Sequence, residues 1–305
     1  MRMIVLAAGQ GKRLRPLTDD RPKALVPFLG RPLLDWTLTA ARENGLSDII
    51  VVGGYKSERL ARPEIQLVDN AAYASTTMVG SLMVAEPWFG TEFVMSYGDI
   101  AYRPEVLRTV LASTAEIGVV VDLDWQAYWE RRFGDPLRDA ESLRMAPDGT
   151  IRSIGRTVDR VEDVQGQYIG LVVFRGRGVK ALRRAWVRAK TDASYRRPIL
   201  GHRNGLDQLA MTDVLDDLTT GDVPIMAIPI HGGWVEIDTP EDIVAGEERW
   251  SVAASPPGLV DPAPAESKVA ETGAGGPGAR GLASPGPSEV GVFRVRPGHR
   301  PTPRW

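Results

Sequence analysis

The chain has 305 residues, with 37 Lys and Arg against 39 Asp and Glu, for a formal net charge of −2. This balance is typical of a globular protein and argues against nucleic acid or an anionic membrane surface as partner. With no Cys, disulfides, thiolate metal sites and Cys nucleophiles are excluded. No apolar run approaches the ~20 residues of a membrane span, and the N-terminal run is too short for a signal peptide. We therefore expect a cytoplasmic enzyme that is not attached to a membrane.

Apolar strands alternate with helical patterns through the first half of the chain. The pattern predicts strands at 3–7, 48–52, 65–68, 93–97 and 117–123, and helices at 34–45, 76–85 and 103–114. Apolar strands separated by helices indicate a mostly parallel sheet that is covered on both faces. Ligands of such sheets bind beyond the carboxyl ends of the strands. Three segments rich in Gly or polar residues fall at those ends: 7–11, 53–55 and 98–99.

The second half is more mixed. Strands are predicted at 151–155, 168–174, 223–228 and 233–238, and helices at 179–189, at 207–218 and from Thr239 onward, while 190–206 is polar and irregular. Thr239 is a suitable N-cap, with Pro240 at the first helical position. Residues 251–305 hold 10 of the 23 Pro. This composition predicts a disordered tail after a single domain of residues 1–250.

The loop after the first strand is the most informative segment. Gly9 and Gly11 let backbone N–H groups approach an anion, and Lys12, Arg13 and Lys23 supply cations, which together indicate a polyphosphate-binding loop. Two common phosphate motifs do not fit. A P-loop needs Ser or Thr where Arg13 stands, and the dinucleotide fingerprint needs Gly where Leu14 stands.

Residues 6–27, LAAGQGKRLRPLTDDRPKALVP, are similar to the LAAGxGxRLxPLTxxxPKxL signature of the sugar-phosphate and phosphocholine-type nucleotidyltransferases. The resemblance implies an α/β, Rossmann-like three-layer nucleotidyltransferase fold with a mostly parallel mixed sheet. It also implies that the Gly9–Arg13 backbone holds the nucleotide phosphates. Arg13 would neutralise the departing pyrophosphate, and Lys23 would reach the α-phosphate or the acceptor. The family usually has Ser or Thr where Lys12 stands.

The nucleotide contacts are predicted at neighbouring strand ends. A Gly pair at a strand end lets the backbone read a base edge, and Asn70, Thr76, Thr77 and Ser81 in the segment 70–81 offer polar side chains. The full predicted set is Leu6, Ala7, Ala8, Gly9, Gly11, Lys12, Gly54, Tyr55, Thr76 and Ser81. Packing on the rim of the sheet explains Tyr55 equally well. Residue types alone do not distinguish cytosine from uracil, thymine or adenine.

The implied reaction is an in-line displacement at phosphorus, which asks mainly for positioning and charge neutralisation. An ionised acceptor oxygen needs no general base, which agrees with a chain that is poor in His and lacks Cys. Mg²⁺, the expected cofactor, prefers carboxylate ligands. Asp99 and Asp238 follow strands, and Glu236 shares a strand face with Asp238. The alternative is that each Asp caps the following helix.

From residue 1 to about 250 the chain also resembles the cytidylyltransferases of phosphonate biosynthesis, relatives of phosphocholine cytidylyltransferase. This resemblance implies CTP as donor and aminoethyl- or hydroxyethylphosphonate, or a phosphocholine-like phosphorylated alcohol, as acceptor. Asp122 and Asp124 would hold an ammonium or hydroxyl group, with Trp125 as a pocket wall and Tyr168 facing the site. Packing on the sheet explains Trp125 equally well. Arg131, Arg132 and Arg156 are weaker candidates for phosphonate ligands.

Two other functions fit parts of the sequence but agree with it less well. A sugar-1-phosphate uridylyl- or thymidylyltransferase fits the signature, but the aromatic and acidic segment 122–132 suits a small cationic or hydroxylated acceptor better. A non-catalytic nucleotide-binding regulator is disfavoured because Arg13, Lys23, Asp99 and Asp238 are all present. The oligomeric state is open, and a homo-oligomer is compatible with the sequence.

Overall fold

A computed structural model describes residues 1–191 and 209–252 of the chain. Its strands are β1 (Arg2–Leu6), β2 (Pro27–Phe28), β3 (Arg31–Pro32), β4 (Ile49–Gly53), β5 (Gln66–Asp69), β6 (Glu92–Tyr97), β7 (Ile100–Tyr102), β8 (Ile117–Asp122), β9 (Glu141–Met145), β10 (Ile151–Thr157), β11 (Gln167–Arg175), β12 (Ile225–Ile230) and β13 (Trp234–Glu236). Its α-helices are α1 (Leu33–Glu43), α2 (Met78–Val84), α3 (Pro104–Ala112), α4 (Trp125–Phe133), α5 (Arg177–Thr191), α6 (Met211–Leu218) and α7 (Pro240–Val252).

A mixed sheet forms the centre of the molecule. Across residues 1–191 and 209–252 it has seven strands in the order β12-β8-β11-β6-β1-β4-β5. Only β11 runs against its neighbours β6 and β8, and the other pairs are parallel. The carboxyl ends of β1, β4, β5, β6 and β8 therefore meet at one edge, which is where the sequence placed its ligand-binding segments.

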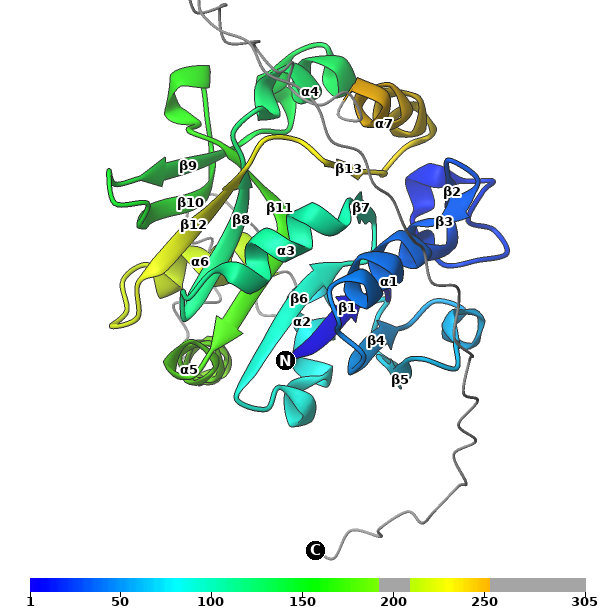
Figure 1. Cartoon of the computed structure of the whole chain (residues 1–305), viewed down its shortest axis with the longest axis horizontal. Coiled ribbons are helices and arrows are strands. Elements are labelled where there is room, and N and C mark those ends of the chain that lie inside the picture. The colour runs from blue at the N-terminus through cyan, green and yellow to red at the C-terminus, as the bar shows by residue number, and fades with distance from the viewer. Residues whose placement is uncertain (192–208, 253–305) are drawn as a thin grey trace, which may run out of the picture. The chain divides into compact units, whose positions relative to one another are not determined.

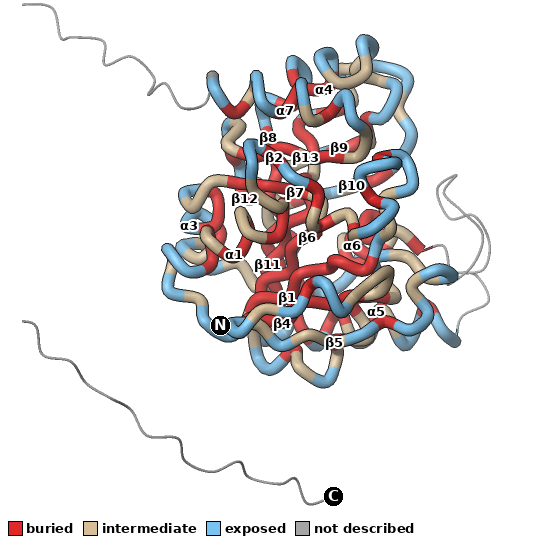
Figure 2. The backbone as a smooth tube through the Cα atoms, turned by 90° about the vertical axis from the view of Figure 1, so that its right-hand side faces the viewer, coloured by how far each residue is buried: buried red, intermediate tan, exposed pale blue. Residues whose placement is uncertain are grey.

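Helices cover both faces of this sheet. α1 and α3 contact each other on one face, in front of the sheet in Figure 1, and α5 and α6 contact each other on the opposite face, as the side view of Figure 2 shows. The central strands between these layers are buried, with Met3, Ile4 and Val5 of β1 0% exposed. A strand that is apolar on both faces thus has a helix layer on each side, and the predicted three-layer α/β fold is confirmed.

Most predicted elements are confirmed to within a few residues, but helix α4 and strands β2, β3, β7 and β9 were not predicted. The predicted acceptor segment after β8 is helix α4, and the hairpin partner of β10 is β9. The predicted strand at 233–238 is shorter, ending at Glu236. The predicted domain boundary at residue 250 falls inside α7, and the predicted tail lies outside the described residues from 253 onward. No helix in the described part combines the length and the apolar character needed to cross a membrane.

Asp122, at the end of β8, connects three elements. Its carboxylate is 0% exposed and accepts hydrogen bonds from Trp234 Nε1 (2.8 Å), from the Gly232 backbone N–H (3.1 Å) and from the Arg249 guanidinium. These contacts join β8 to β13 and α7. The prediction that Asp122 holds an acceptor is therefore wrong, because both of its oxygens are enclosed by protein donors.

We expect Asp122→Ala to lower the free energy of unfolding by about 3–5 kcal/mol, because it leaves the mostly buried Arg249 without its counter-charge. Urea denaturation measures this loss. Asp124→Ala is the matched control, since its carboxylate is 59% exposed and pairs with His231. An exposed pair of this kind contributes less than about 1 kcal/mol. Equal losses in the two variants would contradict a structural role that is particular to Asp122.

Candidate active site

A short ladder brings Asp99 next to Glu236 and Asp238, two carboxylates that lie far along the chain from it. β7 begins directly after Asp99 and pairs antiparallel with β13, with Ile100 opposite Glu236. The Ile237 backbone N–H also donates to the Asp99 carbonyl at 3.0 Å. Carboxylate oxygens of Asp99, Glu236 and Asp238 consequently all lie within 4.8 Å of one another. The structure thus brings together the three predicted metal ligands.

Lys23 lies among these carboxylates. Its Nζ is 2.7 Å from Asp99 Oδ2 and also contacts Asp238 Oδ1, although the lysine side chain is only 13% exposed. Arg13, which is far more exposed, reaches the other Asp238 oxygen at 3.0 Å. The Asp238 carboxylate therefore faces the two predicted catalytic cations. Thr239 instead caps α7 through its Oγ1, which removes the helix-cap alternative for Asp238.

The charges in this cluster stabilise one another. Burial alone would lower the pKa of Lys23, but the Asp99 and Asp238 carboxylates raise it above its ordinary value, so the side chain stays an ammonium. Burial raises the pKa of Glu236; the Arg132 guanidinium opposes this shift, and the charges of Asp238 and Asp99 add to it. Three carboxylates this close repel one another, so the site requires cations to hold them.

Two glycines allow the loops of the site to approach each other. Gly11 has φ = 69°, and a Cβ there would lie 3.0 Å from Cβ of Lys23. A Cβ at Gly98 would lie only 2.7 Å from the Leu6 carbonyl oxygen. A larger residue at Gly98 would push Asp99 away from the end of β1. The Gly-rich loop and the Asp99 turn therefore depend on each other for their positions.

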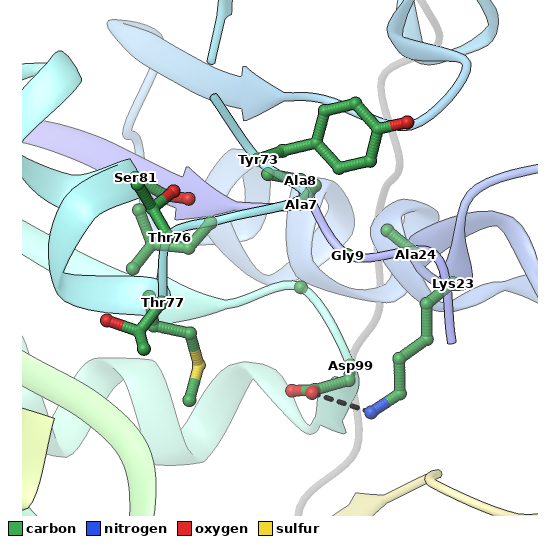
Figure 3. A pocket seen from close by; sticks show the side chains of 13 residues that line it. Ala7, Ala8, Gly9, Lys23, Ala24, Tyr73, Thr76, Thr77, Ser81 and Asp99 are labelled. Atoms are coloured by element: carbon green, nitrogen blue, oxygen red, sulfur yellow. Dashed lines mark hydrogen bonds and ion pairs between the residues drawn. The ribbon is translucent and has the colours of Figure 1, made fainter. Parts of the chain in front are cut away.

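A cavity of about 280 Å³ opens beside Lys23 and Asp99 (Figure 3). Six predicted nucleotide-binding residues line it, namely Leu6, Ala7, Ala8, Gly9, Thr76 and Ser81. Figure 3 shows Lys23 and Asp99 pointing toward each other on one side of this cavity, with Thr76 and Ser81 on the other side and Tyr73 beside Ala8. The cavity thus extends from the predicted base contacts to the predicted catalytic charges.

Four predicted nucleotide-binding residues do not line this cavity. Lys12 is exposed and Gly11 lies against Lys23, while Gly54 is packed below Tyr73 and Ala8. Tyr55 donates its backbone N–H to the Ala8 carbonyl at 3.1 Å and its hydroxyl to the Asp19 carbonyl at 3.0 Å. These contacts give Tyr55 a role in shaping the loop. For Tyr55, the packing alternative is the one that the structure favours.

Five further residues line the cavity: Ala24, Gly98 and, from the predicted segment 70–81, Tyr73, Thr77 and Met78. Asn70 organises this wall from behind, because its side-chain amide donates to Thr76 Oγ1 (3.1 Å) and Ser81 Oγ (3.0 Å). The sequence signal for Asn70 is its polar side chain at the end of a predicted strand, next to a run of hydroxyl residues. Tyr73 carried no such signal, since an aromatic residue in a loop is common.

The predicted acceptor residues do not form one group. Trp125 is 4% exposed and packs near-perpendicular to Trp129, so the packing alternative for Trp125 holds. Asp124 pairs with His231 (2.9 Å) and lines a different pocket. Tyr168 packs edge-on against Tyr97, the residue two positions before Asp99, with ring centroids 5.7 Å apart. Among the four predicted acceptor residues, Tyr168 is therefore the one that packs next to the strand leading to Asp99.

The carboxylate cluster suits a divalent metal ion. All three side chains offer oxygen atoms, the donors that Mg²⁺ prefers. In addition, Asp99 Oδ1 is buried and accepts no hydrogen bond from any described residue. A buried carboxylate oxygen without a partner is costly, and a metal ion would remove that cost.

Comparisons with known proteins point to one chemistry. A family model described as the MobA-like NTP transferase domain matches residues 3–144. The chain is similar to CTP:phosphoglutamine cytidylyltransferase of Campylobacter jejuni, with 30% identity over 82% of this chain and 100% of that protein. It is also similar to UTP–glucose-1-phosphate uridylyltransferase of Haloferax volcanii, with 30% identity over 82% of this chain and 96% of that protein. CMP-5'-(3-aminopropyl)phosphonate synthase of Streptomyces rubellomurinus is 31% identical over 37% of this chain and 19% of that protein.

Solved structures show the same fold. The inositol-1-phosphate CTP transferase from T. maritima has a TM-score of 0.61 at 21% identity, covering 82% of this chain and 94% of that one. The CTP:phosphocholine cytidylyltransferase from Streptococcus pneumoniae has a TM-score of 0.60 at 20% identity, covering 83% and 98%.

Proposed function

The chain belongs to the nucleotidyltransferases that carry the MobA-like NTP transferase domain, and from this premise we propose that it transfers CMP from CTP to a small phosphonate or phosphorylated alcohol. The observation that carries the proposal is the position of Lys23, held between Asp99 and Asp238 at the wall of the cavity below the Gly-rich loop. Pyrophosphate is the second product. The predicted cytoplasmic location stays a prediction.

In the proposed reaction an anionic oxygen of the acceptor attacks the α-phosphorus of CTP. A new P–O bond forms while the bond between the α-phosphorus and the bridging oxygen of the β-phosphate breaks, so the electron pair leaves with pyrophosphate. Backbone N–H groups of the 9–13 loop hold the phosphates. Lys23 offsets the charge at the attacked phosphorus, and Arg13 neutralises the departing pyrophosphate. No side chain has to remove a proton.

Asp99, Glu236 and Asp238 would hold the Mg²⁺ ion, which when bound supplies neutralisation of the phosphate charges. Two of these carboxylates, Asp99 and Asp238, also contact the Lys23 ammonium. Lys23 and a bound metal ion would therefore share the carboxylates of Asp99 and Asp238. With a nucleotide in the cavity, its phosphates would offer the Lys23 ammonium a further anionic partner beside these carboxylates.

Support for CTP and for a phosphonate comes from the named relatives. The Campylobacter relative is a cytidylyltransferase along its whole length, and the Streptomyces relative is named for a cytidylylated aminoalkylphosphonate. The Haloferax relative favours a second candidate function, transfer of UMP to a sugar 1-phosphate, over a similar length. The Haloferax and Campylobacter relatives are equally similar to this chain, at 30% identity. The choice of base and of acceptor is therefore the point to test.

A pyrophosphate-release assay tests the proposal directly. CTP, UTP, dTTP and ATP are each combined with 2-aminoethylphosphonate, hydroxyethylphosphonate, phosphocholine, phosphoglutamine and glucose 1-phosphate, with Mg²⁺ present. We expect CTP with a small phosphonate or phosphorylated alcohol to give the highest kcat/KM. A preference for UTP or dTTP with glucose 1-phosphate would instead establish the second function. Each assay is repeated without acceptor, so that simple nucleotide hydrolysis is subtracted.

A further inference from the structure

Arg132, in the last turn of α4, has a fully buried side chain that points at the carboxylate cluster. Its guanidinium donates to Glu236 at 2.6 Å and to the two oxygens of Asp242 at 2.8 and 3.3 Å. It also lies 3.8 Å from Asp238. One cation therefore contacts two of the three proposed metal ligands, together with an acid that is not one of them.

Asp242 extends this contact to the backbone. It is 2% exposed, and its Oδ2 accepts the N–H groups of Asp238 and Thr239, both at 2.9 Å. Arg132 thus holds Glu236 directly and the Asp238 turn through Asp242. Because this contact spans more than 100 residues, nothing in the local sequence around Arg132 indicates it.

The position of the guanidinium is closely fixed. Its carbon lies 4.7 Å from the ring centroid of Phe133 and 5.4 Å from those of Tyr128 and Trp129. Aromatic rings surround the guanidinium and carboxylates occupy its nitrogens. The side chain therefore cannot reach a bound acceptor substrate. Its 0% exposure removes it as a phosphonate ligand, the weaker role that the sequence suggested.

We propose that Arg132 is a positioning residue that sets the geometry of Glu236 and Asp238 for the divalent cation. The planar fork of an arginine can bind two carboxylates at fixed angles, whereas a lysine offers a single point of charge. Substituting a residue that orients metal ligands typically lowers the affinity for the metal by about 10–100-fold. The inference rests on the proposed metal role of Asp99, Glu236 and Asp238.

Arg132→Lys tests the inference because it keeps the charge and removes the fork. Mn²⁺, whose free form gives an electron paramagnetic resonance signal, is titrated into the full chain to obtain its Kd. We expect the Kd for Mn²⁺ to rise at least ~10-fold, while the Kd for CTP without metal stays unchanged. Arg131→Lys is the matched control, because Arg131 is the neighbouring residue and forms an exposed pair with Glu248.

Asp242→Asn is the second variant, chosen because it leaves Arg132 in place and removes its anchor. We expect Asp242→Asn to weaken Mn²⁺ binding as well. If thermal melting shows that Arg132→Lys is unfolded, the test rests on Asp242→Asn alone. An unchanged Kd for Mn²⁺ in the folded variants would overturn the inference, and so would an equal loss of metal-free CTP binding. If the wild-type chain binds no Mn²⁺, or Asp99→Asn leaves its Kd unchanged, the proposed metal site itself fails.

Discussion

Asp99→Asn is expected to reduce turnover at least ~1000-fold while leaving the fold intact. The metal ion in phosphoryl chemistry stabilises several kcal/mol of transition-state charge, and each ~1.4 kcal/mol is a factor of ten in rate. Asn is nearly isosteric with Asp but carries no charge. Lys23 keeps Asp238 as a partner in this variant, so the fold should persist. Steady-state pyrophosphate release across a Mg²⁺ titration gives the measurement.

The control for this prediction is Asp159→Asn, an exposed acid in the loop after β10. It loses the same charge and should keep wild-type turnover. Circular dichroism and thermal melting of both variants separate a chemical defect from an unfolded one. Turnover of Asp99→Asn near the wild-type level at saturating Mg²⁺ would remove Asp99 from the metal site.

Lys23→Ala should have two effects that point in opposite directions. Removing the ammonium takes a charge away from the attacked phosphorus, which we expect to lower kcat by about 100–1000-fold. It also removes the cation that contacts Asp99 and Asp238 in the protein without metal. The Kd for Mn²⁺ in the absence of nucleotide should therefore fall. Rapid-quench kinetics give the first effect, and Mn²⁺ titration gives the second.

Lys180→Ala is the matched control, because it removes an exposed lysine of α5. We expect it to change neither kcat nor the Kd for Mn²⁺. An unchanged kcat would exclude Lys23 from the reaction. A kcat loss with unchanged Mn²⁺ affinity would retain its catalytic role but exclude competition with the metal. Arg132→Lys should weaken Mn²⁺ binding where Lys23→Ala strengthens it. The opposite changes in the Kd for Mn²⁺ thereby distinguish the role of Arg132 from that of Lys23.

The sequence was most informative where function depends on short-range pattern. Gly9, Gly11 and Lys23 lie in one contiguous signature, and their contacts follow from the end of a single buried strand. Asp99 and Asp238 were found because each follows a strand, and parallel strands end at one edge of the sheet. Their proximity to each other was not implied, since it depends on the β7–β13 pairing.

The errors have a common physical origin. Asp122 ends an apolar strand and therefore resembled a ligand, but its partners Trp234 and Arg249 lie more than 110 residues further along the chain. Arg132 is a parallel case, with its contacts to Glu236 and Asp242. A local pattern places a charged residue at a strand or helix end. It does not identify the opposite charge that tertiary packing brings to it.

The ladder between β7 and β13 determines when the carboxylate cluster is completed during synthesis of the chain. Lys23 emerges from the ribosome with the Gly-rich loop, yet Asp238 follows it 215 positions later. At typical elongation rates of ~5–20 residues per second, Asp238 follows Asp99 by on the order of ten seconds. Over that interval a nascent chain carries the phosphate loop and one carboxylate without the other two. The carboxylate cluster is therefore complete only after β13 has paired with β7, and the proposed turnover, which needs this cluster, would begin only then.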